Sequence, residues 1–305
     1  MTTLVFGHKS PDTDSTGSPI IWAWYLSHMG TPAEPRLLGE PNTEAAFVLR
    51  HWDLPKPQII SDVTPGDSVF IVDTNNPAEL PPSINSANIT GIIDHHMLVG
   101  GLKTAAPIDI TIRPLACTAT IMADLMGAHL SHAPRGIKGA MLSCILSDTL
   151  QFRSPTTTPH DKAVAEALAA DLGVSIPDLA AAQFEAKSDV SAYSDAALLR
   201  MDSKEYTIAG KELRISVLET TAPKVILDRK ASLMASAETV AKEDGADQVM
   251  LFVIDIIREE ATLLVPNDFV KAVAEASFGV KVTGDTVVIP GLMSRKKQIL
   301  PALKM

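Results

Sequence analysis

Short apolar runs alternate with longer helical patterns through the first half of this 305-residue chain. Residues 4–6, 68–72 and 89–93 are rich in branched and aromatic side chains, which is typical of buried parallel strands. Strands that alternate with helices predict a doubly wound α/β domain with a mainly parallel sheet. The helical patterns lie at about residues 20–29, 117–127, 136–150, 160–172 and 177–187, the first with Asp14, Ser15 and Thr16 as candidate caps.

The pattern changes after Lys187. The short polar stretch of residues 188–193 predicts a linker. We therefore predict a first domain over residues 1–187 and a second, smaller mixed α/β domain over residues 194–305. In the second domain the strand patterns lie at about 205–209, 212–218, 248–257 and 262–265, and the helical patterns at about 224–243 and 267–277.

The composition excludes several classes of protein. Hydrophobic residues make up 46% of the chain, which is enough for a sizeable core. The 26 Lys and Arg against 36 Asp and Glu give a net charge of −10, which disfavours a general nucleic-acid binder. The start of the chain does not resemble a signal peptide, and no apolar run approaches the ~18–20 residues of a membrane span. Cys117 and Cys144 are predicted to be buried free thiols, so we expect a cytoplasmic protein with no membrane or nucleic-acid partner.

Acidic and histidine residues collect where the predicted elements end. Three groups follow predicted strands, and a fourth closes a predicted helix. Because open α/β sheets bind ligands beyond the carboxyl ends of their strands, we expect the first three groups to converge there. The residues are His8, Asp12 and Asp14 after the first strand, Asp73 after the second, Asp94, His95 and His96 after the third, and Asp148 at the end of the helix.

Imidazoles combined with several carboxylates suit divalent ions such as Mn²⁺, Co²⁺ or Mg²⁺ better than a structural zinc site. Two histidines and four aspartates are too many for one tetrahedral ion, but suit two ions about 3.5–4 Å apart. Taken singly, Asp73 and Asp14 have ordinary alternatives as turn or capping residues, and the paired histidines could belong to a solvated loop. Because all of these histidines and aspartates lie at the ends of predicted strands or helices, we favour a metal site over these alternatives. The remaining histidines are predicted to be surface or capping residues: His28, His51, His129, His132 and His160.

A basic segment near the C-terminus stands out in this acidic chain. Arg295, Lys296 and Lys297 follow a Pro290-Gly291 turn and precede an apolar stretch, so the segment is predicted to be ordered. An arginine fork beside a lysine matches phosphate oxygens, although a solvated basic face is the ordinary alternative. Lys204 is a further candidate for phosphate binding.

Four motifs occur along the chain in the following order: Gly7-His8-x-x-Pro11-Asp12-x-Asp14, then Asp94-His95-His96, then Ser147-Asp148-Thr149 with Ser154-Pro155-Thr156-Thr157-Thr158, and finally Ser294-Arg295-Lys296-Lys297-Gln298. Together they resemble the manganese-dependent (family II) inorganic pyrophosphatases of the DHH phosphoesterase superfamily. The resemblance covers essentially the whole chain. The first three motifs are shared with other DHH phosphoesterases, whereas the last is specific to the pyrophosphatases.

The resemblance implies a role for each site residue. His8 and Asp12 would hold one metal ion, and Asp14 and His95 the other. Asp73 and Asp148 would contact both ions. Asp94 would orient its neighbours. The residues that contact the phosphates would be His96, on the phosphoryl group under attack, and Lys204, Arg295 and Lys296, on the pyrophosphate oxygens.

The implied reaction is hydrolysis of pyrophosphate to two phosphates by a water shared between two Mn²⁺ ions, in a cleft between the two domains. Co²⁺ would be a possible substitute, and Mg²⁺ would arrive with the substrate. A homodimer is also implied. Two alternatives stay open: another DHH phosphoesterase, acting on short oligonucleotides, nucleoside bisphosphates or short polyphosphate, and a non-catalytic binding protein with this fold.

Three positions depart from the family pattern. Lys9 and Ser10 stand where the family often has Gln-Asn, and Thr74 stands where it often has His. These departures leave the predicted ligands in place, but they bear on metal preference and rate. The chain is too short for the regulatory insert of some family members, so we expect no regulation by nucleotides.

Overall fold

The computed structural model describes residues 2–304 and divides the chain into two compact units. The first unit ends at Lys187, and the second begins at Ser188. Each unit has its own β-sheet and its own apolar core. Within the described residues, the helices are too short or too polar to cross a membrane.

The first unit contains a six-stranded sheet whose strands all run parallel. Its strands are β1 (Thr3–Phe6), β2 (Ala33–Leu37), β3 (Gln58–Ile59), β4 (Ser68–Val72), β5 (Asn88–Asp94) and β6 (Asp109–Ile112). Its helices are α1 (Thr13–His28), α2 (Thr43–His51), α3 (Thr118–Met126), α4 (Arg135–Asp148), α5 (Pro159–Leu172) and α6 (Ile176–Lys187). Short 3₁₀ helices complete it: η1 (Pro77–Glu79), η2 (Ile84–Ser86) and η3 (Gly127–His132).

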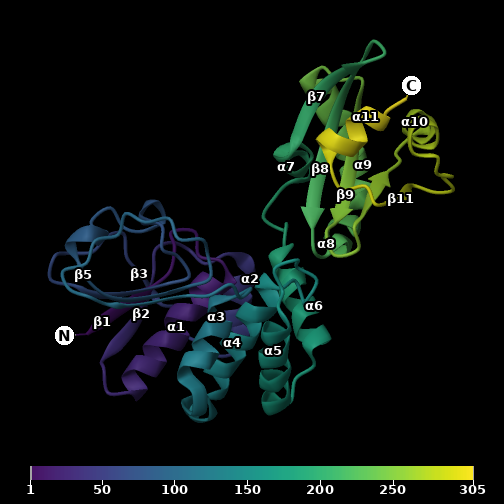
Figure 1. Cartoon of the computed structure of the whole chain (residues 1–305). Helices are drawn as coiled ribbons and strands as arrows, with labels where there is room; N and C mark the ends of the chain where they lie inside the picture. The colour runs from purple at the N-terminus through teal and green to yellow at the C-terminus, as the bar shows by residue number, and fades with distance from the viewer. Residues whose placement is uncertain (1, 305) are drawn as a thin grey trace. The chain divides into compact units, whose positions relative to one another are not determined.

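The strand order of this sheet is β3-β2-β1-β4-β5-β6. The chain adds β2 and β3 on one side of β1 and then β4, β5 and β6 on its other side, so the strand order reverses between β1 and β4. Ligands of open α/β sheets bind in the crevice at such a reversal, beyond the carboxyl ends of the strands. The strand ends of β1, β4 and β5 are therefore neighbours at this place. Figure 1 shows α1, α3, α4 and α5 side by side along the sheet, and these helices contact one another.

Helix α1 begins directly beside the reversal. Asp12 caps it, since its side chain accepts a hydrogen bond of 2.9 Å from the Ser15 N–H. Gly17 lets α1 approach α4, because a Cβ atom there would lie 2.4 Å from Cys144 Sγ. The first turn of α1 is thereby held close to the helix that ends at Asp148. The predicted start of this helix near residue 20 is wrong, because Asp12 rather than Asp14 is the cap and the helix begins at Thr13.

The second unit contains a mixed five-stranded sheet with the order β11-β10-β9-β8-β7. Its strands are β7 (Ser203–Ile208), β8 (Lys211–Thr220), β9 (Gln248–Asp255), β10 (Glu260–Leu264) and β11 (Thr286–Pro290), of which only the pair β8 and β9 is parallel within the described chain. Its helical segments are α7 (Asp195–Met201), α8 (Pro223–Leu227), α9 (Lys230–Asp244), α10 (Asp268–Phe278), the π-helical turn η4 (Arg295–Ile299) and α11 (Leu300–Ala302).

The central strand β9 is buried along its whole length. Alternate side chains of β9 join two different apolar clusters, because successive residues of a strand point to opposite faces. Met250 and Phe252 pack with residues of α10 and η4, whereas Val249 and Leu251 pack with residues of α7, α8 and α9. The second unit is therefore a sheet covered on both faces.

The predicted α/β class and two-sheet organisation are confirmed, as are the predicted helices that correspond to α3, α4, α5 and α6. The prediction missed β2, β3, β6 and β11. Strand β2 contains Pro35 and two charged residues, and β3 has only two residues, so neither carries a clear strand pattern.

Candidate metal centre

The ends of β1, β4 and β5 bring the predicted histidines and aspartates together. His8 follows β1, Asp73 follows β4, and His95 follows β5. Three sets of potential ligand atoms lie within 4.8 Å of one another in each set. The first set is His8, Asp12 and Asp73, the second is Asp73, His95 and His96, and the third is Asp14, Cys117 and Asp148.

Asp73 belongs to two of these sets and is almost completely buried. Its Oδ2 atom lies 3.5 Å from His8 Nε2, and its Oδ1 atom lies 3.5 Å from His95 Nε2. Two ligand atoms about 2.1 Å from one ion lie roughly 3.0–3.4 Å apart. Each oxygen of Asp73 is thus near the spacing at which it could share an ion with a different histidine. Asp73 also has a φ of 59°, a left-handed conformation that is uncommon outside glycine and typical of functional sites.

The N-cap and the first turn of helix α1 each supply one carboxylate. The Oδ2 atom of Asp12 lies 3.8 Å from His8 Nε2, while its other oxygen caps the helix. Asp14 is buried, and its Oδ1 atom accepts a hydrogen bond of 2.6 Å from Ser18. Its Oδ2 atom accepts a hydrogen bond of 2.7 Å from the N–H of Thr118, at the start of α3. The partially positive end of a second helix thereby holds this carboxylate in place.

The two histidines after β5 are oriented through their Nδ1 atoms. His95 Nδ1 lies 3.2 Å from the carbonyl oxygen of Leu115, which leaves Nε2 directed at Asp73. His96 Nδ1 lies 2.8 Å from Asp94 Oδ1, and Asp94 also accepts from the backbone N–H groups of both histidines. Burial raises the pKa of Asp94, but the hydrogen bonds from His96 and Asn75 outweigh burial and lower that pKa. Asp94 is therefore ionised and fully buried, and its hydrogen bonds hold His95 and His96 in place.

Asp148, the last residue of α4, faces Asp14 and the thiol of Cys117. Its Oδ2 atom is buried and has no hydrogen-bond partner among residues 2–304. Burial, followed by the charges of Asp14 and Asp73, raises the pKa of Asp148 well above its usual range. A buried carboxylate oxygen with no donor costs free energy that a bound cation would recover. The three residues after Thr149 all have positive φ angles, which adds local backbone strain beside this carboxylate.

The same crowding acts on Asp73. Burial raises its pKa well above the usual range, and the charges of Asp14 and Asp12 add to this effect. Several aspartate carboxylates together with histidine imidazoles form a donor set that suits divalent ions such as Mn²⁺ and Co²⁺. The residues present therefore fit a metal centre with Asp73 in the middle.

Three neighbours of the centre were not predicted from the sequence to lie in it: Cys117, Thr118 and Asn75. Cys117 and Cys144 are buried free thiols, as predicted, but Cys117 lies within the centre and donates a hydrogen bond to Asp14. Burial and the charge of Asp14 raise the pKa of Cys117 well above its usual range, which favours the thiol. The hydroxyl of Thr118 donates a hydrogen bond to Asp73, and the side-chain amide of Asn75 donates one to Asp94. The only signal for Thr118 and Cys117 is their place at a helix start, because they lie more than 100 residues from Asp14 in the chain.

A pocket of about 600 Å³ opens beside His8 and His96. The three positions that depart from the family pattern, Lys9, Ser10 and Thr74, all line it. Lys9 reaches across to the carbonyl oxygen of Ala78, and Thr74 donates to Glu79. These departures therefore change the wall of a pocket next to the centre and leave the predicted ligands in place.

The predicted phosphate-binding residues lie in the second unit. Arg295 begins η4, and its guanidinium binds both the carbonyl oxygen and the carboxylate of Asp202, at 2.9 and 2.7 Å. Asp202 immediately precedes β7, the strand that carries Lys204. Lys204, Lys296 and Lys297 have exposed side chains. Within the second unit, the basic segment is thus ordered and tied to the start of β7.

Comparison with known proteins finds a family model in each part of the chain and relatives that match nearly its full length. Residues 2–148 match the model of the DHH family, N-terminal domain, and residues 181–305 match the DHHA2 domain. A crystal structure described as that of a "putative family II inorganic pyrophosphatase" from Methanococcus jannaschii aligns with 98% of this chain and 97% of its own, with a TM-score of 0.61 and 33% identity.

Relatives of similar length give the same family. A protein of Deinococcus radiodurans named probable manganese-dependent inorganic pyrophosphatase is 38% identical over 98% of this chain and 97% of its own length. A protein of Lactobacillus acidophilus with the same name is 34% identical over 98% of this chain and 97% of its own length. The chain therefore belongs to the manganese-dependent, family II inorganic pyrophosphatases.

Proposed function

We propose that this protein is a manganese-dependent inorganic pyrophosphatase that hydrolyses pyrophosphate to two phosphates. The observation that carries the proposal is the position of Asp73, whose two carboxylate oxygens each lie 3.5 Å from the Nε2 atom of a different histidine. Such a carboxylate can bridge two ions, as two-metal phosphoryl hydrolases require. The full-length relatives of Deinococcus radiodurans and Lactobacillus acidophilus carry the name of this activity.

The predicted ligands divide naturally between two ions. His8 and Asp12 would hold the first, Asp14 and His95 the second, and Asp73 and Asp148 would contact both. When bound, the ions would supply Lewis acidity that makes a water molecule a competent nucleophile near neutral pH. We propose Mn²⁺ as the native ion, with Co²⁺ as a substitute and Mg²⁺ entering with the substrate, since the imidazoles favour later first-row ions over Mg²⁺.

The protein's own residues then position the substrate. Asp94 holds His96 through Nδ1, which leaves Nε2 free to contact a phosphoryl oxygen. His96 also lines the pocket of about 600 Å³, next to Lys9 and Ser10, and we propose that this pocket receives one end of the pyrophosphate. Donors fixed in advance stabilise charge that develops in the transition state without reorganisation.

The second unit would bind the remaining phosphate oxygens. We propose that Lys204, Arg295 and Lys296 hold the leaving phosphate, and that residues 188–193 link the catalytic and substrate-binding domains. The ion pair of Arg295 with Asp202 supports this role, because it orients the guanidinium fork before substrate arrives.

The protein is further proposed to be cytoplasmic and homodimeric. The exposed edge strand β6, with half-exposed Ile110, is a surface through which a first domain could pair with a second copy. Light scattering on the purified chain would measure the mass directly, and a monomer at micromolar concentration would contradict the dimer.

A phosphate-release assay with the full chain tests the proposed reaction. Pyrophosphate, tripolyphosphate and a dinucleotide are supplied in parallel, each with Mn²⁺ and with Mg²⁺. We expect pyrophosphate to be cleaved at least about 100-fold faster than the other two, because the motif of residues 294–298 is the one specific to the pyrophosphatases. Preference for the dinucleotide or tripolyphosphate would support the alternative phosphoesterase, and release from none of them would support a binding protein.

A further inference from the structure

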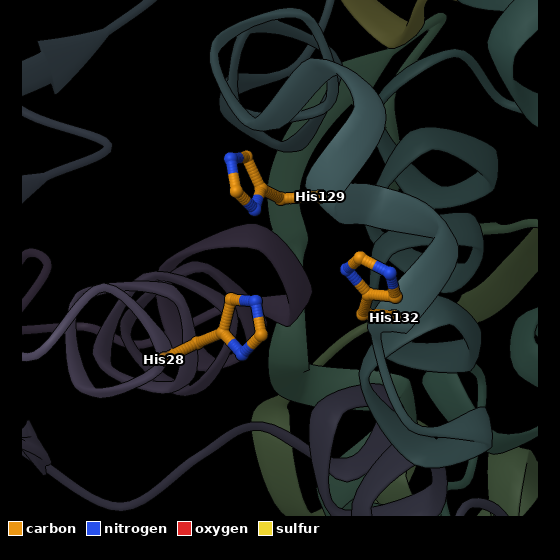
Figure 2. Close-up of side chains that lie close together, drawn as sticks. All are labelled: His28, His129 and His132. Atoms are coloured by element: carbon orange, nitrogen blue, oxygen red, sulfur yellow. The ribbon is translucent and has the colours of Figure 1, made fainter.

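Three histidines that were predicted to be surface or capping residues lie together at the far end of α1. His28 is the last residue of this helix, and His129 and His132 belong to the 3₁₀ helix η3. Residues i and i+3 of a 3₁₀ helix lie on the same face, so η3 presents its two histidines together. Figure 2 shows the three rings around a common space, with a nitrogen of each ring turned toward it.

The rings are close enough to share a ligand. The ring centroid of His28 lies 5.6 Å from that of His129 and 5.7 Å from that of His132. A nitrogen from each ring can be chosen so that all three lie within 4.8 Å of one another. In a tetrahedral zinc site with Zn–N distances of about 2.0–2.1 Å, the nitrogens lie roughly 3.3 Å apart. His132 is exposed, so a small rotation of its side chain would bring its ring nitrogen closer to those of the other two histidines.

Two observations distinguish this cluster from a chance surface grouping. The Nδ1 atom of His129 is buried and has no hydrogen-bond partner within the described part of the chain. The ring of His28 is stacked on Trp24, with 5.1 Å between ring centroids and 13° between planes. One nitrogen thus lacks a partner, and a second ring is held in a fixed orientation.

We propose that His28, His129 and His132 form a second metal site, separate from the catalytic centre, that binds a borderline divalent ion of the Zn²⁺, Ni²⁺ or Cu²⁺ type. Three imidazoles without a carboxylate suit such ions and not the harder Mg²⁺ or Mn²⁺. Three protein ligands leave a fourth position for water or another ligand.

The site lies far from the proposed reaction. His28 is 14 residues after Asp14 in one continuous helix, which corresponds to about 21 Å at 1.5 Å per residue. A metal ion here would fasten the end of α1 to η3 without contacting the substrate. The expected effect is therefore on the stability of the first unit and not on the chemical step.

Equilibrium dialysis against micromolar Zn²⁺, followed by metal analysis, tests the proposal on the full chain without a histidine tag. Wild type is compared with His28→Gln and His132→Gln, and His51→Gln serves as the control because His51 is an exposed histidine outside the cluster. We expect both cluster variants to hold one zinc ion fewer per chain than wild type and the control. The comparison does not depend on how many ions the catalytic centre retains.

Two further readouts accompany the metal count. Zn²⁺ is expected to raise the melting temperature of wild type and of His51→Gln more than that of the cluster variants. Activity with Mn²⁺ is expected to be equal in all four proteins. Equal zinc content in all four, or loss of an ion in His51→Gln as well, would overturn the second site.

Discussion

The candidate metal centre of the first unit and the basic segment of the second differ in how their charged side chains are paired. Asp14 and Asp73 are buried beside other carboxylates, and the pKa of Asp73 is raised by burial and then by Asp14. Arg295, in contrast, is paired with Asp202, and its lysine neighbours are exposed. The carboxylates of the first unit repel one another until cations bind. The guanidinium of Arg295, in contrast, already has a charge partner when no ligand is present. Substitutions in the two regions should therefore fail in different ways.

The largest effect is expected at Asp148, which has a buried oxygen without a partner in residues 2–304 and is proposed to contact both ions. Asp148→Ala should lose tight Mn²⁺ binding and about 5 kcal/mol or more of transition-state stabilisation. Metal analysis and kcat/KM for pyrophosphate measure the two losses. Asp178→Ala, at an exposed acid of α6, is the control and should retain both. Undiminished metal content in Asp148→Ala would disprove the bridging role.

Arg295→Ala should separate substrate binding from metal binding. We expect unchanged Mn²⁺ content and a loss of about 2–5 kcal/mol in kcat/KM, the scale for a buried charge-pair partner. Lys297→Ala in the same segment is the matched control, since no role is assigned to this exposed lysine. If the two variants are equally active, the basic segment is only a solvated face.

Asp94 offers a smaller test within the metal centre, because it orients His96 and is not itself a proposed ligand. Removing a partner that orients a site residue typically costs 10–100-fold in metal affinity or activity. Asp94→Asn should therefore lower kcat by roughly this factor while the metals remain bound. A decrease no larger than that of Asp178→Ala would show that the loop keeps its geometry without the carboxylate.

The last test is the pH dependence of the stability of the metal-free protein, which leaves the chemical step out. The pKa values of Asp73 and Asp148 are raised in the folded state, so the folded chain binds more protons than the unfolded chain above the ordinary carboxyl range. The free energy of unfolding should fall as pH rises from about 4 through the raised pKa values, by about 1.4 kcal/mol per pH unit for each proton retained. Thermal melts at several pH values measure this slope, and saturating Mn²⁺ should remove it. A metal-free protein whose stability increases over this range would contradict the crowding of the carboxylates.

The sequence predicted the α/β class and the strand ends that carry the metal centre, because strand ends and acidic motifs are local features. It could not predict that α3 returns to Asp14, since Thr118 donates to Asp14 across 104 residues of chain. The start of α1 was misplaced for a local reason. Asp12 and Asp14 are both capable caps, and only the structure shows that Asp12 accepts from Ser15.

The histidine cluster could not be predicted from the sequence for the same reason. His28 and His132 are separated by 104 positions, and each taken alone has the sequence context of a surface residue. Only the packing of η3 against the end of α1 brings them together. The predicted ligand roles and phosphate-binding roles stay predictions, although the geometry of the first unit supports the ligand roles.

The most direct test of the account is a Mn²⁺ titration of chelator-stripped protein in the presence of Mg²⁺, with bound Mn²⁺ and pyrophosphate hydrolysis measured on the same samples. We predict that activity rises in step with bound Mn²⁺, because the proposed centre around Asp73 would be incomplete without it. Stripped protein that hydrolyses pyrophosphate equally well in Mg²⁺ alone would contradict the manganese dependence of this centre.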